Sequence, residues 1–134
     1  MLQLTYISTA ARDICDASID NILRVSRSKN SAAGVTGMLL YDGRRFLQAL
    51  EGEHATVMQT FQRIQIDRRH KAVVMLSSNE VAIRSFGSWA MAAERLASQN
   101  SQDIGAMVEA MTEQVSDANI RATFRSFSRL RTPS

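Results

Sequence analysis

The sequence predicts a small α+β domain, and three observations support this fold class. Several short segments alternate apolar and polar residues with the period of a β-strand, others carry apolar residues at helical spacing, and the two kinds follow one another in a regular order. With 134 residues and 45% hydrophobic residues, the chain is long enough for one domain with a real core. Its net charge of +3 permits an anionic partner without requiring one.

The segment 37–53, GMLLYDGRRFLQALEGE, is predicted to form two strands joined by a tight turn at Asp42-Gly43. Side chains of the second strand alternate between two faces, one with Phe46, Gln48 and Leu50 and the other with Leu47 and Ala49. Gln48 is therefore an amide on an apolar face. Because a buried amide without a partner is costly, we expect a polar group opposite it.

The remaining elements follow from the same periodicities. Strands are predicted over 2–8, 35–41, 44–51, 71–77 and 88–93, and helices over about 13–27, with Asp13 as N-cap, and over 54–67. The apolar run AVVML at 72–76 predicts a central place in the sheet for the fourth strand. The order β-α-β-β-α-β-β is the ferredoxin-like arrangement with one added strand, and we expect both helices on one face of the sheet.

The composition changes after Arg95, so we predict a first unit over 1–95 and a helical tail over 96–134. Two amphipathic helices are expected in the tail, with apolar stripes of Ile104, Met107, Val108 and Met111 and of Ile120, Phe124 and Phe127. Arg121, Arg125 and Arg129 are expected on the far side of the last helix. Since the stripes need cover, we place the tail on the bare face of the sheet.

The sequence offers little for catalysis or metal binding. It contains no HExxH, no paired-cysteine motif and no GxSxG, and its Gly-x-x-Gly at 34–37 precedes a strand, so we expect no enzyme activity. His54 and His70 have no neighbouring cysteine and are expected as surface or capping residues. One cysteine, no signal peptide and no membrane-length apolar run indicate a cytoplasmic protein without a membrane partner.

Tyr6, Asn30, Gln48, Trp89 and Met91 form a set of polar and aromatic residues on strands and at a helix end. Taken singly, Tyr6, Trp89 and Met91 have an ordinary interpretation as core residues and Asn30 as a helix C-cap, while Gln48 stays open between a structural hydrogen bond and a ligand contact. Taken together, Tyr6 and Gln48 become neighbours, because the first and third strands of such a sheet are adjacent. We expect them, with Asn30, at an apolar slot walled by Ile22, Phe46 and Leu50, suited to a flat heterocycle with carbonyl and N–H edges.

Five motifs extend this pattern over residues 1 to about 95. They are LTYIS near the start, Asn-x-x-x-Gly-x-x-Gly-x-Leu from Asn30 to Leu39, FLQALEGE around Gln48, Asp-x-Arg-His at 67–70 and SWAM around Trp89. In spacing and order the chain resembles the BLUF family, blue-light sensors that use a flavin. The tail over 96–134 is similar to that of short, single-domain members.

The resemblance implies that FAD, or FMN or riboflavin, binds noncovalently between the two helices. It implies that Tyr6 is the photochemical electron and proton donor, that Gln48 lies between the Tyr6 hydroxyl and flavin N5 and O4, and that Asn30 bonds the flavin carbonyl edge. The remaining implied binding residues are Ile22, Ser26, Phe46 and Leu50 around the ring and Lys29, Arg63, Asp67, Arg69 or His70 at the ribityl and phosphate portion. For these charged residues, a purely solvated role is the alternative. Trp89 and Met91 are implied to relay the change at Gln48 to the tail.

A separate effector protein is the partner that the resemblance implies, for example a cyclic-nucleotide enzyme, a cyclic-dinucleotide enzyme or a transcription regulator. A homodimer or higher oligomer stays open.

Three alternative functions differ in what they require of the sequence. An acylphosphatase-like hydrolase would need a phosphate cradle that the hairpin lacks. A ferredoxin-like nucleic-acid binder fits the pI of about 9.6, but aromatic residues are only 6% and the tail is expected to cover the sheet face that such proteins expose, so direct nucleic-acid binding is not favoured. A flavin-binding relative without photochemistry is disfavoured by the presence of both Tyr6 and Gln48.

Overall fold

The computed structural model describes residues 1–86, 92–95, 106, 108–110, 112–113, 115 and 117–130. Within this part of the chain, the strands are β1 (Leu2–Ala10), β2 (Thr36–Tyr41), β3 (Arg45–Gly52), β4 (His70–Glu80) and β5 (Ala92–Arg95). They form one sheet in the order β4-β1-β3-β2-β5, in which β5 is parallel to β2 and the other neighbours are antiparallel. This confirms the ferredoxin-like arrangement with an added strand.

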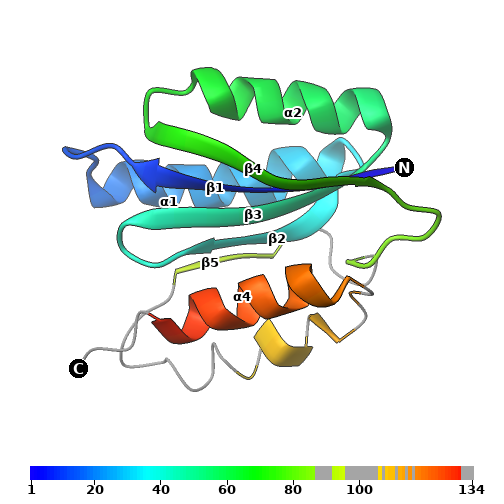
Figure 1. The fold of residues 1–134 in the computed structure, drawn as a ribbon. Helices are drawn as coiled ribbons and strands as arrows, with labels where there is room; N and C mark the ends of the chain where they lie inside the picture. Colours follow the sequence, from blue (N-terminus) through cyan, green and yellow to red (C-terminus); the bar gives the residue numbers. More distant parts are fainter. Residues whose placement is uncertain are drawn as a thin grey trace.

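Helices cover both faces of the sheet (Figure 1). On one face lie α1 (Asp16–Val25), continued by a π-helical turn η1 (Ser26–Asn30), and α2 (His54–Ile66). On the other face lies α4 (Ala118–Leu130), as expected for the tail. Among the described residues, no helix has the length and apolarity needed to cross a membrane.

The β2–β3 hairpin forms as its sequence predicts. Asp42 Oδ1 accepts hydrogen bonds from the backbone N–H groups of Arg44 and Arg45 at 2.9 and 2.7 Å, and Gly43 takes the positive φ of 98° that the turn requires. The turn sets the register of the two strands and therefore the face on which Gln48 lies.

Alternation along β3 separates two hydrophobic cores. Phe46 and Leu50 pack on the side of α1 and α2, whereas Leu47 and Ala49 pack on the side of α4. β1 is the direct neighbour of β3, and its Tyr6 stands opposite Gln48. One strand thus contributes both to the helix-covered site and to the surface on which the tail lies.

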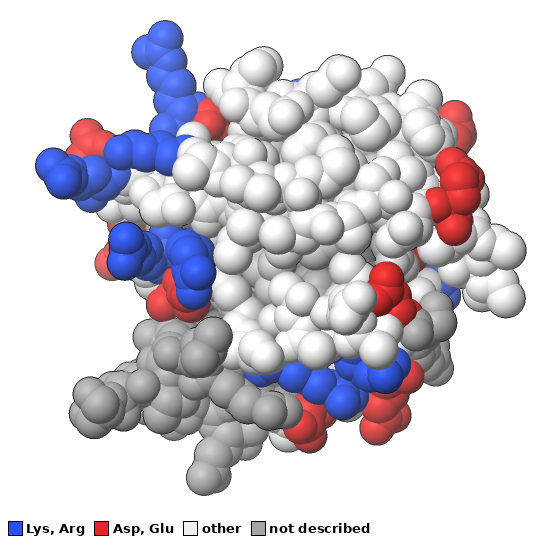
Figure 2. Space-filling view, viewed as in Figure 1, with Lys and Arg blue, Asp and Glu red and all other residues white. Residues whose placement is uncertain are grey.

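The prediction of a central β4 is wrong. Among the described strands, β4 pairs only with β1 and forms an edge of the sheet, with Val74, Met75 and Leu76 each 43–51% exposed. The apolar run reflects side-chain character, which does not reveal how many strands lie beside it. On the face shown in Figure 2, the centre is free of charged side chains, which lie at its left and right sides and along its lower part.

The prediction that Asp13 is the N-cap of α1 is also wrong. The helix begins at Asp16 after Cys15, because residues 11–14 form a separate turn in which Ile14 N donates to Ala11 O at 3.1 Å. Asp13 lies within that turn and is not the N-cap of α1.

The last helix is held on the sheet by its apolar stripe. Ile120, Phe124 and Phe127 are buried, and the ring of Phe124 lies 6.2 Å from that of Phe86 between centroids. Two of the arginines expected on the far side of this helix, Arg121 and Arg125, tie it to the preceding part of the tail. Arg121 donates to Val115 O at 2.6 Å, and Arg125 donates to Thr112 Oγ1 at 3.1 Å and Glu109 O at 3.2 Å.

Parts of the tail prediction lie outside the described residues: Ile104, Met107 and Met111, as well as the side chain of Arg129. Val108 is described and buried in the same core as Phe124.

Replacing Phe124 with alanine tests the docking of α4. The change removes a fully buried ring, so we expect the free energy of unfolding to fall by about 3–5 kcal/mol in urea denaturation. The exposed neighbour Ser126→Ala is the control and should change it by less than about 0.5 kcal/mol. Equal stability of the two variants would contradict the packing of Phe124 against the sheet.

Candidate functional site

A cavity of about 190 Å³ opens between α1, α2 and the sheet. It is lined by most of the predicted binding residues, namely Tyr6, Ile22, Ser26, Lys29, Asn30, Gln48, Arg63, Asp67, Arg69 and His70. Sequence reasoning missed four further lining residues, Val25, Leu39, Thr60 and Ile64. Helical or strand periodicity places each of these near the cavity-facing side, but their types carry no chemical signal.

Phe46 and Leu50 are not part of this lining, although they share the face of Gln48. Each lies two residues from Gln48 along β3, and that distance carries Phe46 under α1 and Leu50 under α2. Both are fully buried in the cores on either side of the cavity. Trp89 and Met91 lie outside the described residues.

The floor of the cavity is a buried chain of four polar side chains. Tyr6 Oη donates to Gln48 Oε1 at 2.6 Å, and Gln48 Nε2 donates to Ser26 Oγ at 2.9 Å. Asn30 Nδ2 also donates to Ser26 Oγ, at 3.1 Å. The polar partner expected for Gln48 is therefore present, and one serine joins the two carboxamides.

The π-helical turn η1 directs Ser26 and Asn30 into the cavity. Both residues are buried, while residues 27–29 between them are exposed. A π turn widens the helix locally and is frequently found at functional sites. Asn30 is thus inside the turn, with Ser31 as the C-cap, and its side chain serves the cavity rather than the helix end.

Burial keeps the Tyr6 phenol protonated. Loss of solvation raises the pKa of Tyr6 well above its ordinary value, and the charge of Asp67 adds to the rise. Tyr6 is therefore a hydrogen-bond donor at neutral pH, which agrees with the short contact to the carbonyl oxygen of Gln48.

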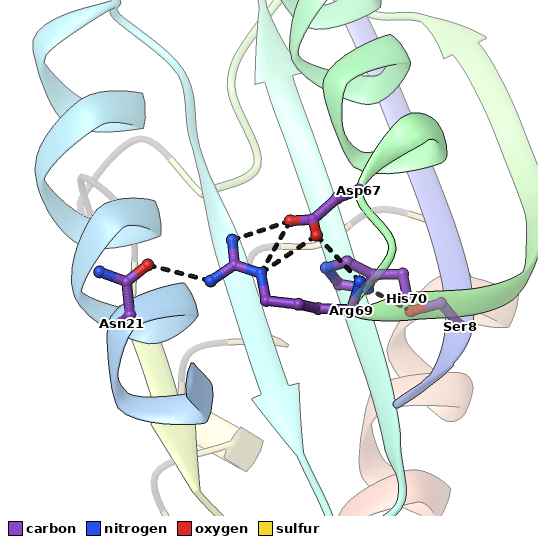
Figure 3. Close-up of polar contacts among 5 residues, drawn as sticks. All are labelled: Ser8, Asn21, Asp67, Arg69 and His70. Carbon is purple, nitrogen blue, oxygen red and sulfur yellow. Dashed lines mark hydrogen bonds and ion pairs between the residues drawn. The ribbon is translucent and has the colours of Figure 1, made fainter. Parts of the chain in front are cut away.

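Hydrogen bonds across the rim of the cavity link the C-terminal end of α2 to α1 (Figure 3). Arg69 forms a paired contact with Asp67, at 2.8 Å from Nη2 to Oδ2 and 3.1 Å from Nε to Oδ1, and its Nη1 donates to Asn21 Oδ1 on α1 at 3.0 Å. The hydrogen bond from Arg69 lowers the pKa of Asp67, and Asp67 in turn raises the pKa of Arg69, so the pair is ionised. Asn21 was not predicted, because nothing in its local sequence points to a partner 48 positions away.

The expectation that both histidines lie at the surface is confirmed for His54 and wrong for His70. His54 is exposed, with Nε2 3.5 Å from a carboxylate oxygen of Glu80. His70 is only 8% exposed, shares a 2.8 Å hydrogen bond between its Nδ1 and Ser8 Oγ, and lies with its ring 4.7 Å from that of Phe46. Loss of solvation lowers the pKa of His70 to about 4, so its imidazole is neutral at physiological pH.

These groups suit a planar ligand with both donor and acceptor edges. The Asn30 carboxamide nitrogen donates to Ser26, and the same side chain carries a carbonyl oxygen that can accept a hydrogen bond. Lys29 and Arg63 are exposed cations at the same cavity and suit an anionic group. Within the described ranges, no cluster of three or more His, Cys, Asp or Glu could hold a metal ion.

Comparison with known proteins agrees with this site. Residues 1–92 match the family model BLUF, described as sensors of blue-light using FAD. Photoactivated adenylate cyclase subunit alpha of Euglena gracilis is 35% identical over 88 residues, and the blue light- and temperature-regulated antirepressor BluF of Escherichia coli is 32% identical over 88 residues. Each match covers 66% of this chain, but only 9% of the cyclase subunit and 22% of BluF.

Similarity to a solved structure extends further along the chain. The dark-state structure of BlrB, a BLUF protein, superposes with a TM-score of 0.71 at 26% identity and covers 95% of this chain and 94% of that one. The likeness therefore includes the region of α4 as well as the cavity.

The pH dependence of stability tests the environment of His70. Between pH 6.5 and about 4 the unfolded chain takes up a proton at this residue and the folded ligand-free chain does not, so folding stability falls as pH falls through this window. Above pH 6.5 the imidazole is neutral in both states, and below about pH 4 it is charged in both.

We expect the wild type to lose roughly 3 kcal/mol more than His70→Gln between pH 7 and pH 4, measured by urea unfolding. The difference between the two proteins removes the contribution of the carboxylates. Parallel stability curves would contradict the assigned pKa direction.

Proposed function

This chain belongs to the BLUF family of blue-light sensors that use FAD, and we propose that light changes the hydrogen bonding of Gln48, alters the docking of α4 and so regulates a partner protein. The observation that carries the proposal is the 2.6 Å hydrogen bond from Tyr6 Oη to Gln48 Oε1 at the cavity. In this proposal residues 1–95 are the photosensory unit and residues 96–134 the output segment.

The residues of the cavity fit a flavin. Ser26, Asn30 and Gln48 offer donors and acceptors for the edge of the ring, and Lys29 and Arg63 offer cations for phosphate. The volume of about 190 Å³ is below the range of about 300–1,000 Å³ for pockets that enclose a whole ligand, so we place the ring inside and the rest of the dinucleotide toward solvent. When bound, FAD supplies the absorption of blue light and, in its excited state, a strong oxidant.

Tyr6 is the residue that we assign as the donor of an electron and a proton. Its phenol is buried, neutral and hydrogen-bonded, and its raised pKa disfavours loss of the proton alone. Loss of an electron makes a phenol far more acidic, so the proton can then leave Oη toward Gln48 Oε1.

Gln48 can be satisfied in two orientations. In the structure, its carbonyl faces the Tyr6 hydroxyl and its N–H₂ faces Ser26. Both of these partners are hydroxyl groups, which donate as well as accept, so a rotated amide would keep a hydrogen bond to each. Two such arrangements of nearly equal shape make Gln48 a two-state element, with the rotated state presenting a different polar edge to the ligand.

The route to the tail begins on the opposite face of β3. Leu47 and Ala49, on either side of Gln48, pack in the same core as Phe124 of α4. A change in the position of β3 therefore acts directly on the docking surface of α4. The name of the similar antirepressor BluF supports regulation of a separate protein as the output, without catalysis by this chain.

Replacing Tyr6 with phenylalanine tests the photochemistry. Because only the hydroxyl is lost, we expect flavin to remain bound and the light-induced red shift of its absorption bands to disappear. The matched control is Tyr41→Phe, which removes the hydroxyl of the other tyrosine, a buried residue outside the cavity lining, and should keep the shift. A normal, dark-reversible shift in the Tyr6 variant would refute this assignment.

Hydrogen–deuterium exchange of wild-type protein tests the output. We expect peptides covering residues 118–130 to exchange faster under blue light than in darkness, since weaker docking exposes their backbone. Peptides from α2 serve as the internal reference. Identical uptake by α4 in light and dark, in a sample whose flavin spectrum does shift, would contradict regulation through the tail.

A further inference from the structure

Glu51 is a fully buried carboxylate outside the light-sensing cavity. It lies on β3, three residues after Gln48, on the face that carries Leu47 and Ala49. Its neighbours across the sheet are Gln3 on β1 and Thr36 on β2. A carboxylate buried in this way is costly unless it is hydrogen-bonded, so its partners indicate what it does.

Four donors converge on the two oxygens of Glu51. Oε1 accepts from Thr36 Oγ1 at 2.8 Å and from the backbone N–H of Phe86 at 2.6 Å. Oε2 accepts from Gln3 Nε2 at 3.0 Å and from the backbone N–H of Ser85 at 3.0 Å. An ionised carboxylate has acceptor sites for about four hydrogen bonds, so this set satisfies the side chain.

Two of these donors belong to the backbone of the segment that follows β4. From the β4 edge, this segment crosses to the face of the sheet that α4 covers. Neither Ser85 nor Phe86 belongs to a strand. Arg84 adds a further tie, since its Nη1 donates to Thr36 Oγ1 at 2.9 Å and to the backbone oxygen of Glu51 at 3.1 Å. Glu51 therefore holds residues 84–86 against β3 through polar contacts.

Phe86 extends this connection to the tail. Its side chain is fully buried in the core shared by Leu47, Ala49 and α4, and its ring lies 6.2 Å from that of Phe124. A continuous set of contacts thus runs from β3 through the Glu51 carboxylate to the Phe86 backbone, and from the Phe86 ring to α4.

We propose that Glu51 is the positioning residue that couples β3 to α4, by fixing Phe86 against Phe124. This coupling role rests on the proposed function, in which a change at Gln48 reaches the tail. Short, charged hydrogen bonds to backbone N–H groups make the segment 84–86 follow β3 closely. Apolar contact alone would let Phe86 slide when β3 shifts.

The test is Glu51→Gln in the full chain reconstituted with FAD. Glutamine keeps the shape of the side chain but replaces one of the two acceptor oxygens with N–H₂. Each oxygen of Glu51 accepts from one backbone N–H, that of Phe86 or that of Ser85, so one of these two N–H groups loses its acceptor. Because Gln48 faces the other side of β3, we expect the dark spectrum and the red shift to be unchanged. We expect the light-minus-dark deuterium uptake of residues 118–130 to shrink by roughly twofold or more.

The matched control is Glu53→Gln, the same chemical change two residues further on at an exposed position without a side-chain hydrogen bond to the helix that follows. It should keep the full light-minus-dark difference. A merely structural role for Glu51 would raise uptake equally in darkness and in light and leave the difference intact. That result in Glu51→Gln would overturn the coupling role.

Wild-type protein measured in parallel distinguishes failure of the proposed output from failure of the coupling role of Glu51. A wild type without any light-dependent difference in α4 contradicts the proposed output and the coupling role together, whereas a wild-type difference that persists in Glu51→Gln contradicts the coupling role alone. If Glu51→Gln does not fold, Thr36→Val makes a milder change in the same cluster, since it removes one donor to Glu51 and one of the two acceptors of Arg84 Nη1. The same reduced difference is expected there, and a full difference would likewise overturn the role.

Discussion

The hydrogen bond between Tyr6 and Gln48 is the interaction on which the rest of the site depends. It exists because β1 and β3 are adjacent and antiparallel in a register that sets the two residues opposite each other. A shift of that register by one residue would turn Gln48 toward the tail and leave Tyr6 without its partner. The Asp42-Gly43 turn, which fixes β3 against β2, and the packing of Leu4 and Leu50 beside the pair therefore serve the site as much as the fold.

The two faces of β3 have different roles. Toward α1 and α2 it presents an amide whose partners are two hydroxyl groups, an arrangement that tolerates exchange of donor and acceptor. Toward α4 it presents Leu47, Ala49 and the buried carboxylate of Glu51, an arrangement that resists movement because its partners include backbone N–H groups with no other acceptor in the described contacts. A changeable side and a rigid side on one strand suit a sensor, in which a local rearrangement must act on a distant surface as a unit.

The charged side chains around the cavity are either exposed, as Lys29 and Arg63 are, or paired, as Asp67 and Arg69 are. Asp67 and Arg69 neutralise each other at the rim and reach across to Asn21, while burial keeps Tyr6 protonated and His70 neutral. An uncharged interior with fixed hydrogen bonds keeps the protonation of these groups constant over the physiological pH range. The hydrogen bonding of Gln48 is then the feature that is free to change.

The sequence by itself determined the order of the elements, the hairpin, the faces of β1 and β3 and the residue types of the cavity, because periodicity and turn chemistry are local properties. It also identified the family through motifs whose spacing spans the first two thirds of the chain. Only the tertiary structure decided that β4 is an edge strand, that Phe46 and Leu50 lie beside the cavity, that His70 is buried and that Asn21 reaches Arg69. The partners of Glu51 were likewise invisible, because a carboxylate next to a glycine at the end of a strand looks like a solvated residue until distant segments fold over it. The physical reason is the same in each case. Burial and long-range hydrogen bonds depend on which distant segments pack together, and the local sequence pattern does not contain that information.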